Sequence, residues 1–353
     1  DAESIKKIED KLKIRLIGEV YSQGPISKLE DYDFVVYYNG FLRNITNEMY
    51  ELDSQIAELY DLIRDNIFND VDEFDRMINY SPIFIATEGL EQKFFMSKEE
   101  FQRGLSESPL MKMLNAETKI KLIYMYDLQS MIYDFKNSFY SIGNPYIFSS
   151  NELCNIVNNV FKMCNGLEGK SRYEYFFQGP QVDVLSSYFM SVIIRLCSTL
   201  DLLTKFIFEI TNIPKEYNKF IKFKSGRIYF SNIGRFVDVF KELNNYEGSI
   251  VEKRESFQEI ILVRNTIIHN SFLSIKPSIT IGYGTPEINN HNLTYGKIYM
   301  WDIDEDGKAT RWLNRSRFYS QSRCIQEYLL SEMLKFYFSF SKTIALFKEY
   351  LEL

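Results

Sequence analysis

The residues of this chain best suited to chemistry lie in segment 257–272, FQEIILVRNTIIHNSF. Arg264, Asn265 and His269 stand there in a run that is otherwise almost entirely apolar. An arginine offers a fixed fork of donors that matches phosphate oxygens, and a histidine titrates near neutral pH. Such a pair suits proton transfer and charge stabilisation at a phosphate group.

Apolar residues recur at helical spacing in this segment and predict a helix that is covered on nearly all sides. Arg264 falls where the core-facing stripe requires another apolar residue. Because burying an unpartnered guanidinium costs several kcal/mol, we expect an anionic group to face it, either a carboxylate or a bound phosphate. The residues predicted to form the stripe are Phe257, Ile260, Ile261, Ile267 and Ile268.

The run 264–269, RNTIIH, resembles the R-N-x-x-x-H signature of HEPN domains, a superfamily of helical bundles. Many of its members are metal-independent ribonucleases of toxin–antitoxin, abortive-infection and CRISPR systems. The resemblance covers roughly residues 180–353. It implies that His269 assists proton transfer while a ribose 2′-hydroxyl attacks the adjacent phosphate, and that Arg264 stabilises the charge on phosphorus. Asn265 lies four residues before His269, so it shares that helical face and is expected to orient the imidazole or contact substrate.

The spacing of the motif bears on oligomeric state. Five residues separate Arg264 from His269, which places them about 140° apart on an ideal helix. HEPN proteins commonly dimerise so that two motifs line one cleft, and the resemblance implies the same homodimer here.

The resemblance therefore implies an endoribonuclease of a defence or toxin system that needs no metal and no other cofactor. RNA is the expected substrate, and an antitoxin or other partner protein is possible. The alternative is a non-catalytic HEPN-like module that binds RNA, a nucleotide or a protein. A third hypothesis is a structural scaffold in which Arg264 pairs with Asp201.

Asp201 interrupts the apolar segment 182–210 and is the candidate partner of Arg264 and the fourth candidate catalytic residue. An Asp on a helix face that pairs elsewhere or reaches solvent is the competing interpretation, and Arg195 in the same segment leaves both possibilities open. His291, the only other histidine, stands in a polar stretch and is interpreted as a surface residue.

A basic segment downstream of the motif is the candidate RNA path. No acidic residue occurs in 308–323, and aromatic rings alternate with the cations, as single-strand binding requires. A solvated hairpin whose rings anchor to the core explains the same pattern. The candidate RNA-binding residues are Lys308, Arg311, Trp312, Arg315, Arg317 and Arg323.

Asp302, Asp304 and Asp306 match the first half of a calcium loop, but the twelfth position is Leu313 where a glutamate is required. We interpret them as part of a turn. The four cysteines are far apart, with no zinc-type spacing, and no metal site is expected.

Hydrophobic periodicity and turn residues predict a mostly α-helical protein. The expected helices are 4–16, 33–68, 71–78, 97–104, 115–140, 149–164, 182–210, 232–243, 250–272 and 321–353. A small hairpin is expected at 221–230, a loop at 275–292, and an exposed hairpin with arms 295–303 and 308–313 around the turn 304–307.

The length of 353 residues favours two domains. We predict an acidic helical domain at 1–166 of unknown role, a linker at 167–180 and a HEPN-like helical bundle with a small β-hairpin insertion at 181–353. Residues 30–107 carry 18 acidic and 6 basic side chains, or −12, so the remainder sums to −7 + 12 = +5.

The compartment is predicted from the cysteines and the apolar segments. Widely spaced cysteines are interpreted as buried thiols of a reducing cytoplasm. The chain opens with DAESIKKIEDKL, which lacks the apolar core of a signal peptide. Segment 182–210 is interrupted by Arg195 and Asp201 and reads as a core helix, so no membrane association is expected.

Overall fold

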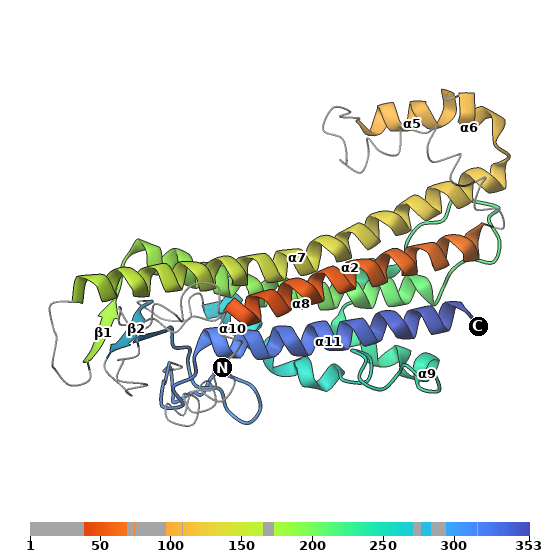
Figure 1. The fold of residues 1–353 in the computed structure, drawn as a ribbon. Coiled ribbons are helices and arrows are strands. Elements are labelled where there is room, and N and C mark those ends of the chain that lie inside the picture. Colours follow the sequence, from red (N-terminus) through yellow and green to blue (C-terminus); the bar gives the residue numbers. More distant parts are fainter. Residues whose placement is uncertain are drawn as a thin grey trace. The chain divides into compact units, whose positions relative to one another are not determined.

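The computed structural model describes residues 39–68, 74, 97–107, 109–164, 173–270, 277–283, 294–315 and 317–353. This part of the chain is mostly α-helical, as predicted, and contains one small antiparallel sheet (Figure 1). Helix 4–16, all of helix 71–78 except one residue, and His291 lie outside the described residues. The helices are α2 (Asn39–Ile67), α5 (Lys98–Glu107), α6 (Pro109–Met113), α7 (Ala116–Cys164), α8 (Pro180–Ile210), α9 (Val237–Phe240), α10 (Gln258–Asn270) and α11 (Ile325–Leu351). The strands are β1 (Tyr173–Phe177), β2 (Ile279–Tyr283) and β3 (Thr294–Lys297), and 3₁₀ helices are formed by Ser225–Arg227, Phe230–Phe236 and Arg254–Phe257.

Local signals place several helix starts correctly. Ser97 and Glu100 form a capping box at the expected start of α5, since Glu100 N donates to Ser97 Oγ at 3.2 Å and Ser97 N donates to Glu100 Oε2 at 2.7 Å. Asn115 Oδ1 accepts from Thr118 N at 2.8 Å and caps α7. The predicted apolar row of α2 is buried: Ile45, Met49, Leu52, Ile56, Leu59 and Ile63.

The predicted break between residues 140 and 149 is wrong, because α7 continues from Ala116 to Cys164 with Pro145 inside it. Pro145 lacks the N–H that would bond one turn back, so one backbone hydrogen bond of the helix is missing there. Ser149, expected to start a new helix, instead donates its hydroxyl to Pro145 O at 2.6 Å within the same helix.

The chain forms two compact units, each built from three separated stretches. The first comprises Asp1–Glu51, Ser138–Ser198 and Lys253–Ser339, and the second comprises Leu52–Asn137, Thr199–Glu252 and Phe340–Leu353. Each of the helices α2, α7, α8 and α11 contributes residues to both units.

Tyr146 ties helices together inside the first unit. Its ring lies 6.0 Å from the Phe189 ring of α8, and its hydroxyl donates to Gln326 O of α11 at 3.0 Å. Close approach of α2 to α7 depends on Gly143, because a Cβ there would collide with Met49 Sδ and lie 3.1 Å from Tyr337 Oη. A side chain at Gly143 would therefore require the Met49 side chain to move.

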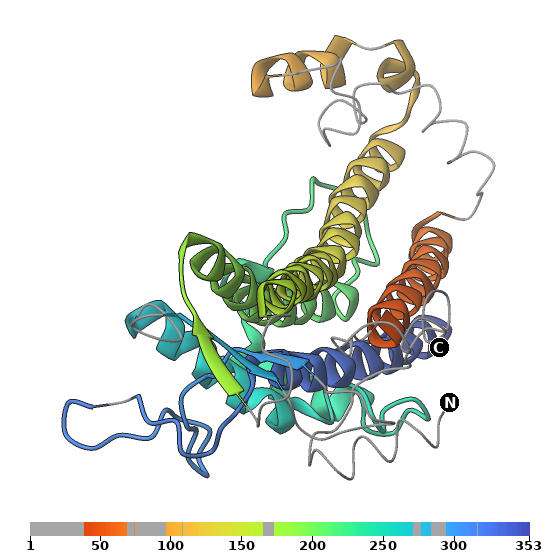
Figure 2. The same ribbon diagram turned by 60° about the vertical axis from the view of Figure 1, so that its left-hand side comes forward.

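The sheet also belongs to the first unit and has the order β1-β2-β3. The yellow-green β1 lies beside the blue strands in Figure 2, with Phe176 opposite Thr280 and Thr280 opposite Lys297. Gly296 faces α7, where a Cβ would collide with Val157 Cγ2. β2 lies within the predicted loop 275–292 and β1 within the predicted linker, so neither strand was foreseen.

In the second unit, aromatic rings join α7, α8 and α11. The Phe135 ring lies 4.8 Å from Phe206 and 6.0 Å from Phe340. The predicted hairpin at 221–230 is wrong: Lys224 N and Ser225 N donate to the buried carboxylate of Glu209 at 2.9 and 2.8 Å, and a 3₁₀ turn follows. The predicted helix 232–243 is replaced by a 3₁₀ helix and the short α9.

Candidate functional site

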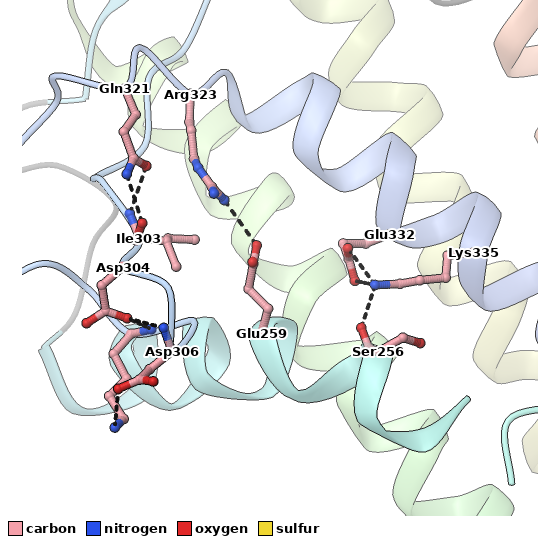
Figure 3. A network of polar contacts seen from close by, with 10 residues as sticks. Ser256, Glu259, Ile303, Asp304, Asp306, Gln321, Arg323, Glu332 and Lys335 are labelled. Atoms are coloured by element: carbon pink, nitrogen blue, oxygen red, sulfur yellow. Dashed lines mark hydrogen bonds and ion pairs between the residues drawn. The ribbon is translucent and has the colours of Figure 1, made fainter. Parts of the chain in front are cut away.

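The motif helix α10 is anchored at its start by α11. Lys335 Nζ donates to Ser256 O at 2.6 Å, lies 2.7 Å from Glu332 Oε2 and stands 5.2 Å from the centre of the Phe257 ring (Figure 3). Burial raises the pKa of Glu332, although Lys335 pulls it down. The 3₁₀ helix Arg254–Phe257, which leads directly into α10, is thus fixed by charge-assisted bonds in a largely buried setting.

A second anchor lies one turn further along α10. Arg323 Nη1 lies 3.0 Å from Glu259 Oε1, and both side chains are about one third exposed (Figure 3). Gly307 also rests on this turn: it has φ +79°, and a Cβ there would lie 3.1 Å from Glu259 Cα. Arg323, a candidate RNA-binding residue, is therefore engaged in positioning α10.

A third contact comes from α8, where Cys197 Sγ lies 3.7 Å from Ile260 O. Cys197 and Cys324 are buried free thiols, and Cys154 is a half-buried one. These contacts define which side of α10 faces the core. The residues buried on that side differ from the predicted apolar stripe. Ile268 is 53% exposed, and Ile261 is half-buried. The buried positions are Phe257, Ile260, Val263 and Ile267.

The motif residues occupy the rest of α10. Arg264 and Asn265 are half-buried, and His269 is exposed in the last turn. Arg264 therefore stands beside the buried row instead of within it, because Val263 takes the core position. Within one chain, α10 is exposed on the side of Ile268 and His269, so its coverage on that side stays a prediction.

Arg264 Nη1 donates to Asn265 Oδ1 at 2.8 Å. The acceptor is a neutral amide, so this contact orients the guanidinium without neutralising its charge. An oriented cation on a half-buried helix face is suited to an anionic ligand such as a phosphate.

Asp201 lies in the part of α8 that belongs to the second unit, where its Oδ1 accepts from Phe230 N at 2.8 Å. It thus holds the start of a 3₁₀ helix. Its pairing with Arg264 and its catalytic role stay predictions.

The basic segment follows a turn formed by residues 304–307, as predicted. Asp304 N donates to Lys308 O at 2.8 Å, and one bridge joins Ile303 to Ala309. Lys308, Arg311, Trp312 and Arg315 are exposed and Arg317 is half-buried. A tight turn in which Trp312 and Arg315 exchange backbone hydrogen bonds of 2.9 and 3.0 Å presents the indole to solvent, 62% exposed.

Asp302 has a structural role. It is buried, and its carboxylate accepts from Ser320 N, Ser320 Oγ and Gln321 N at 2.6–2.9 Å. Across the described ranges, no three His, Cys, Asp or Glu side chains are grouped to hold a metal ion. The same ranges contain no helix that is long and apolar enough to cross a membrane.

Two hollows of the first unit were not predicted. A groove of about 720 Å³ follows α8, with Asp183, Ser187, Ser191 and Arg195 among its lining residues. A smaller pocket of about 310 Å³ lies at the sheet, lined by Phe176, Ser186, Pro277, Ser278, Thr280, Ile298, Tyr299, Tyr319 and Ser322. The recurrence of Ser187, Ser191 and Arg195 every four residues is the sequence signal that α8 has an accessible polar face.

Comparison with known families gives one match. The model of the family described as HEPN_Cthe2314-like HEPN matches residues 86–315, which is more than half of the 353 residues. The matched range contains α7, α8, α10 and the motif. No curated protein and no solved structure matches the chain.

Proposed function

Because this chain belongs to the HEPN_Cthe2314-like HEPN family, we propose that it is a metal-independent endoribonuclease with Arg264 and His269 as its catalytic residues. A ribose 2′-oxygen attacks the adjacent phosphorus, the bond from phosphorus to the 5′-oxygen breaks, and the products are a 2′,3′-cyclic phosphate and a 5′-hydroxyl. His269 assists transfer of the proton that the 2′-hydroxyl loses, the leaving 5′-oxygen takes up a proton, and Arg264 stabilises the added negative charge on the phosphate oxygens.

The observation that carries the proposal is the arrangement of α10. Lys335 fixes the 3₁₀ helix that leads into α10 and Arg323 fixes the first turn of α10, while Arg264, Asn265 and His269 follow on the accessible part of α10. A rigid helix that presents a cation and a titratable group lowers the entropic cost of positioning them on a substrate.

The proposal includes a homodimer and a role in a defence or toxin system. Arg264 and His269 are about 140° apart around the helix axis, so one copy does not direct both side chains along one line. A second copy that presents the same helix across a two-fold axis supplies the missing group. The exposed Ile268 beside His269 is the kind of apolar residue such an interface covers.

The second candidate function is a HEPN-like module that binds RNA, a nucleotide or a protein and does not cut. The hydrogen bond from Arg264 to Asn265 favours it, because that bond occupies one guanidinium nitrogen within the chain. In that case the protein would bind RNA, a nucleotide or a protein, and no RNA cleavage product would form.

His269→Ala tests the proposal. It should lower the rate of RNA cleavage at least 100-fold, the usual contribution of a general acid–base group. His291→Ala, at the only other histidine, is the matched control and should cleave like the wild-type protein. Cleavage should also survive EDTA. Undiminished cleavage by a folded His269→Ala protein overturns the proposal.

A further inference from the structure

The pocket at the sheet has a chemical character of its own. Its rings are Phe176, Tyr299 and Tyr319, and its hydroxyls include those of Ser186 and Thr280. None of the described residues that line it is charged. Its volume of about 310 Å³ is at the lower end of the roughly 300–1,000 Å³ of small-ligand sites, so it suits one flat ring system.

Ser186 is the strongest sign of a ligand. The side chain is 1% exposed, lines the pocket from α8, and its hydroxyl makes no hydrogen bond to any described residue. A buried hydroxyl without a partner destabilises the fold, and a bound group with a polar edge would supply the missing hydrogen bond.

Two other residues that line the pocket have unusually exposed rings, and a third has an uncommon backbone conformation. Phe176 is 71% exposed on β1 directly opposite Thr280, and Tyr319 is 38% exposed. Ser322 has φ +51°, a left-handed conformation that is uncommon for a residue other than glycine. It closes a turn in which Ser322 N donates to Tyr319 O at 3.3 Å, so one turn brings a ring and a hydroxyl to the same hollow.

From these features we infer that the pocket binds one unpaired nucleobase, which stacks on Phe176 or Tyr319 and hydrogen-bonds Ser186. Rings accept the face of any base, and hydroxyls both donate and accept along its edge. The absence of charge among the described lining residues fits a base and not a phosphate. The inference rests on the proposed function in that the base belongs to RNA.

The position of the pocket beside the basic segment supports the binding of a base that belongs to the substrate RNA strand. Tyr319 and Ser322 belong to the basic segment 308–323, whose exposed cations suit the phosphates of the same strand. Pro277 lines both this pocket and the larger groove, which contains Arg195. Ser186 and Arg195 are nine residues apart on α8, which is about 13–14 Å along the axis and half a turn around it. Pro277, and not one face of α8, therefore links the pocket to the groove that contains Arg195.

The probe for the test is 2-aminopurine riboside, whose fluorescence is quenched when it stacks. The wild-type protein should quench it saturably, and the affinity should not change between low and high salt because no phosphate is involved. Phe176→Ala should weaken binding at least fivefold, in line with base–ring stacking. Ser186→Ala should weaken it about two- to tenfold, as expected for one hydrogen bond.

Phe338→Ala is the matched control, since Phe338 is also an exposed phenylalanine, 60% exposed, and does not line the pocket. It should bind the riboside like the wild-type protein. The inference is overturned if no saturable quenching occurs, if Phe176→Ala binds as tightly as Phe338→Ala, or if phenylalaninamide competes as well as adenosine.

These measurements need no cleavage, so they are independent of the catalytic proposal. Riboside binding that persists in a His269→Ala protein supports the pocket even if no RNA is cut. Cleavage that depends on His269 while Phe176→Ala leaves riboside binding unchanged supports the nuclease and overturns the pocket.

Discussion

At the scale of single residues, Arg264 and His269 differ in their surroundings. Arg264 is half-buried and oriented by Asn265, whereas His269 is exposed at the end of α10. A guanidinium held in place loses little side-chain entropy when it meets a phosphate. An exposed imidazole keeps access to solvent for proton exchange, so the two residues suit the different roles assigned to them.

Glu332 gives a prediction about pH. Its ordinary pKa is about 4.5, and burial raises it in the folded protein, with Glu259 adding to the rise and Lys335 opposing it. A raised carboxyl pKa stabilises the fold fully below the unfolded pKa, and this contribution is lost as pH rises through the folded pKa. The free energy of unfolding of the wild-type protein should therefore fall relative to Glu332→Gln as pH increases above about 4.5.

Urea unfolding of both proteins at pH 4 and pH 7 checks this. The ion pair with Lys335 forms only when Glu332 is ionised, so its effect is already part of the net pKa shift. The change in the stability difference between the two pH values therefore measures that net shift. If the wild-type protein gains stability relative to Glu332→Gln between pH 4 and pH 7, the predicted rise in the pKa of Glu332 is contradicted.

At the scale of elements, α10 depends on the turn that contains Gly307. Its φ of +79° and the 3.1 Å distance between a built Cβ and Glu259 Cα disfavour any side chain. Gly307→Ala should lower the free energy of unfolding by about 1–3 kcal/mol and reduce RNA cleavage. Gly226→Ala is the control, since nothing lies within 4 Å of its Cβ position. Equal stability of the two variants in urea would disprove the role of Gly307.

The basic segment gives a prediction about salt. Lys308, Arg311 and Arg315 are exposed, and each is expected to neutralise one phosphate. Changing all three to Gln should reduce the salt dependence of RNA affinity by about two logarithmic units per logarithmic unit of salt, at roughly 0.7 per phosphate for single strands.

The matched control for this experiment changes the exposed Lys215, Lys219 and Lys222 to Gln, which removes the same charge elsewhere. Fluorescence anisotropy with a labelled single-stranded RNA at several salt concentrations measures both slopes. Identical slopes for the two triple variants would show that the segment is not the RNA path.

Most of the long helices were predictable, whereas strands β1 and β2 were not, for physical reasons. The apolar row of α2 and the caps Ser97 and Asn115 are local signals, and the structure confirms them. Strands β1 and β2 are five residues each, and their existence depends on pairing with segments far along the chain. Alternation in 221–230 suggested a hairpin, but the carboxylate of Glu209 takes the backbone donors instead.

The site shows the same division. The motif and its helix follow from spacing within α10, and the structure confirms a helix over Gln258–Asn270. The ion pair of Arg323 with Glu259 joins residues 64 apart in sequence, and the pocket joins β1, α8 and the turn at Ser322. The periodicity of a sequence contains no information about such long-range contacts. Arg323 was therefore predicted only as an RNA-binding residue, although it also forms an ion pair that positions α10.

At the scale of the whole molecule, the family match begins at residue 86, upstream of the boundary predicted at 167–180. Each of the two compact units draws on stretches from both sides of that boundary. Most of the described long helices are thus shared between the units, and the division at 167–180 stays a prediction.

The homodimer gives a prediction about association. Ile268 is 53% exposed next to His269, and a lysine there would place a charge in the proposed interface. Ile268→Lys should raise the dimer dissociation constant at least tenfold and lower cleavage in parallel. Phe338→Lys, at another exposed apolar residue of the first unit, should leave both unchanged. Sedimentation velocity over a range of concentrations measures association, and a wild-type protein that stays monomeric would contradict the dimer.

The chemistry of cleavage is tested most directly by mass spectrometry of the RNA ends produced in EDTA. The wild-type protein should leave a 2′,3′-cyclic phosphate and a 5′-hydroxyl, and a 2′-deoxy nucleotide at the cut position should block cleavage there. The same ends should be absent with His269→Ala. Products with 5′-phosphate ends, or cleavage that EDTA abolishes, would contradict metal-independent catalysis by Arg264 and His269.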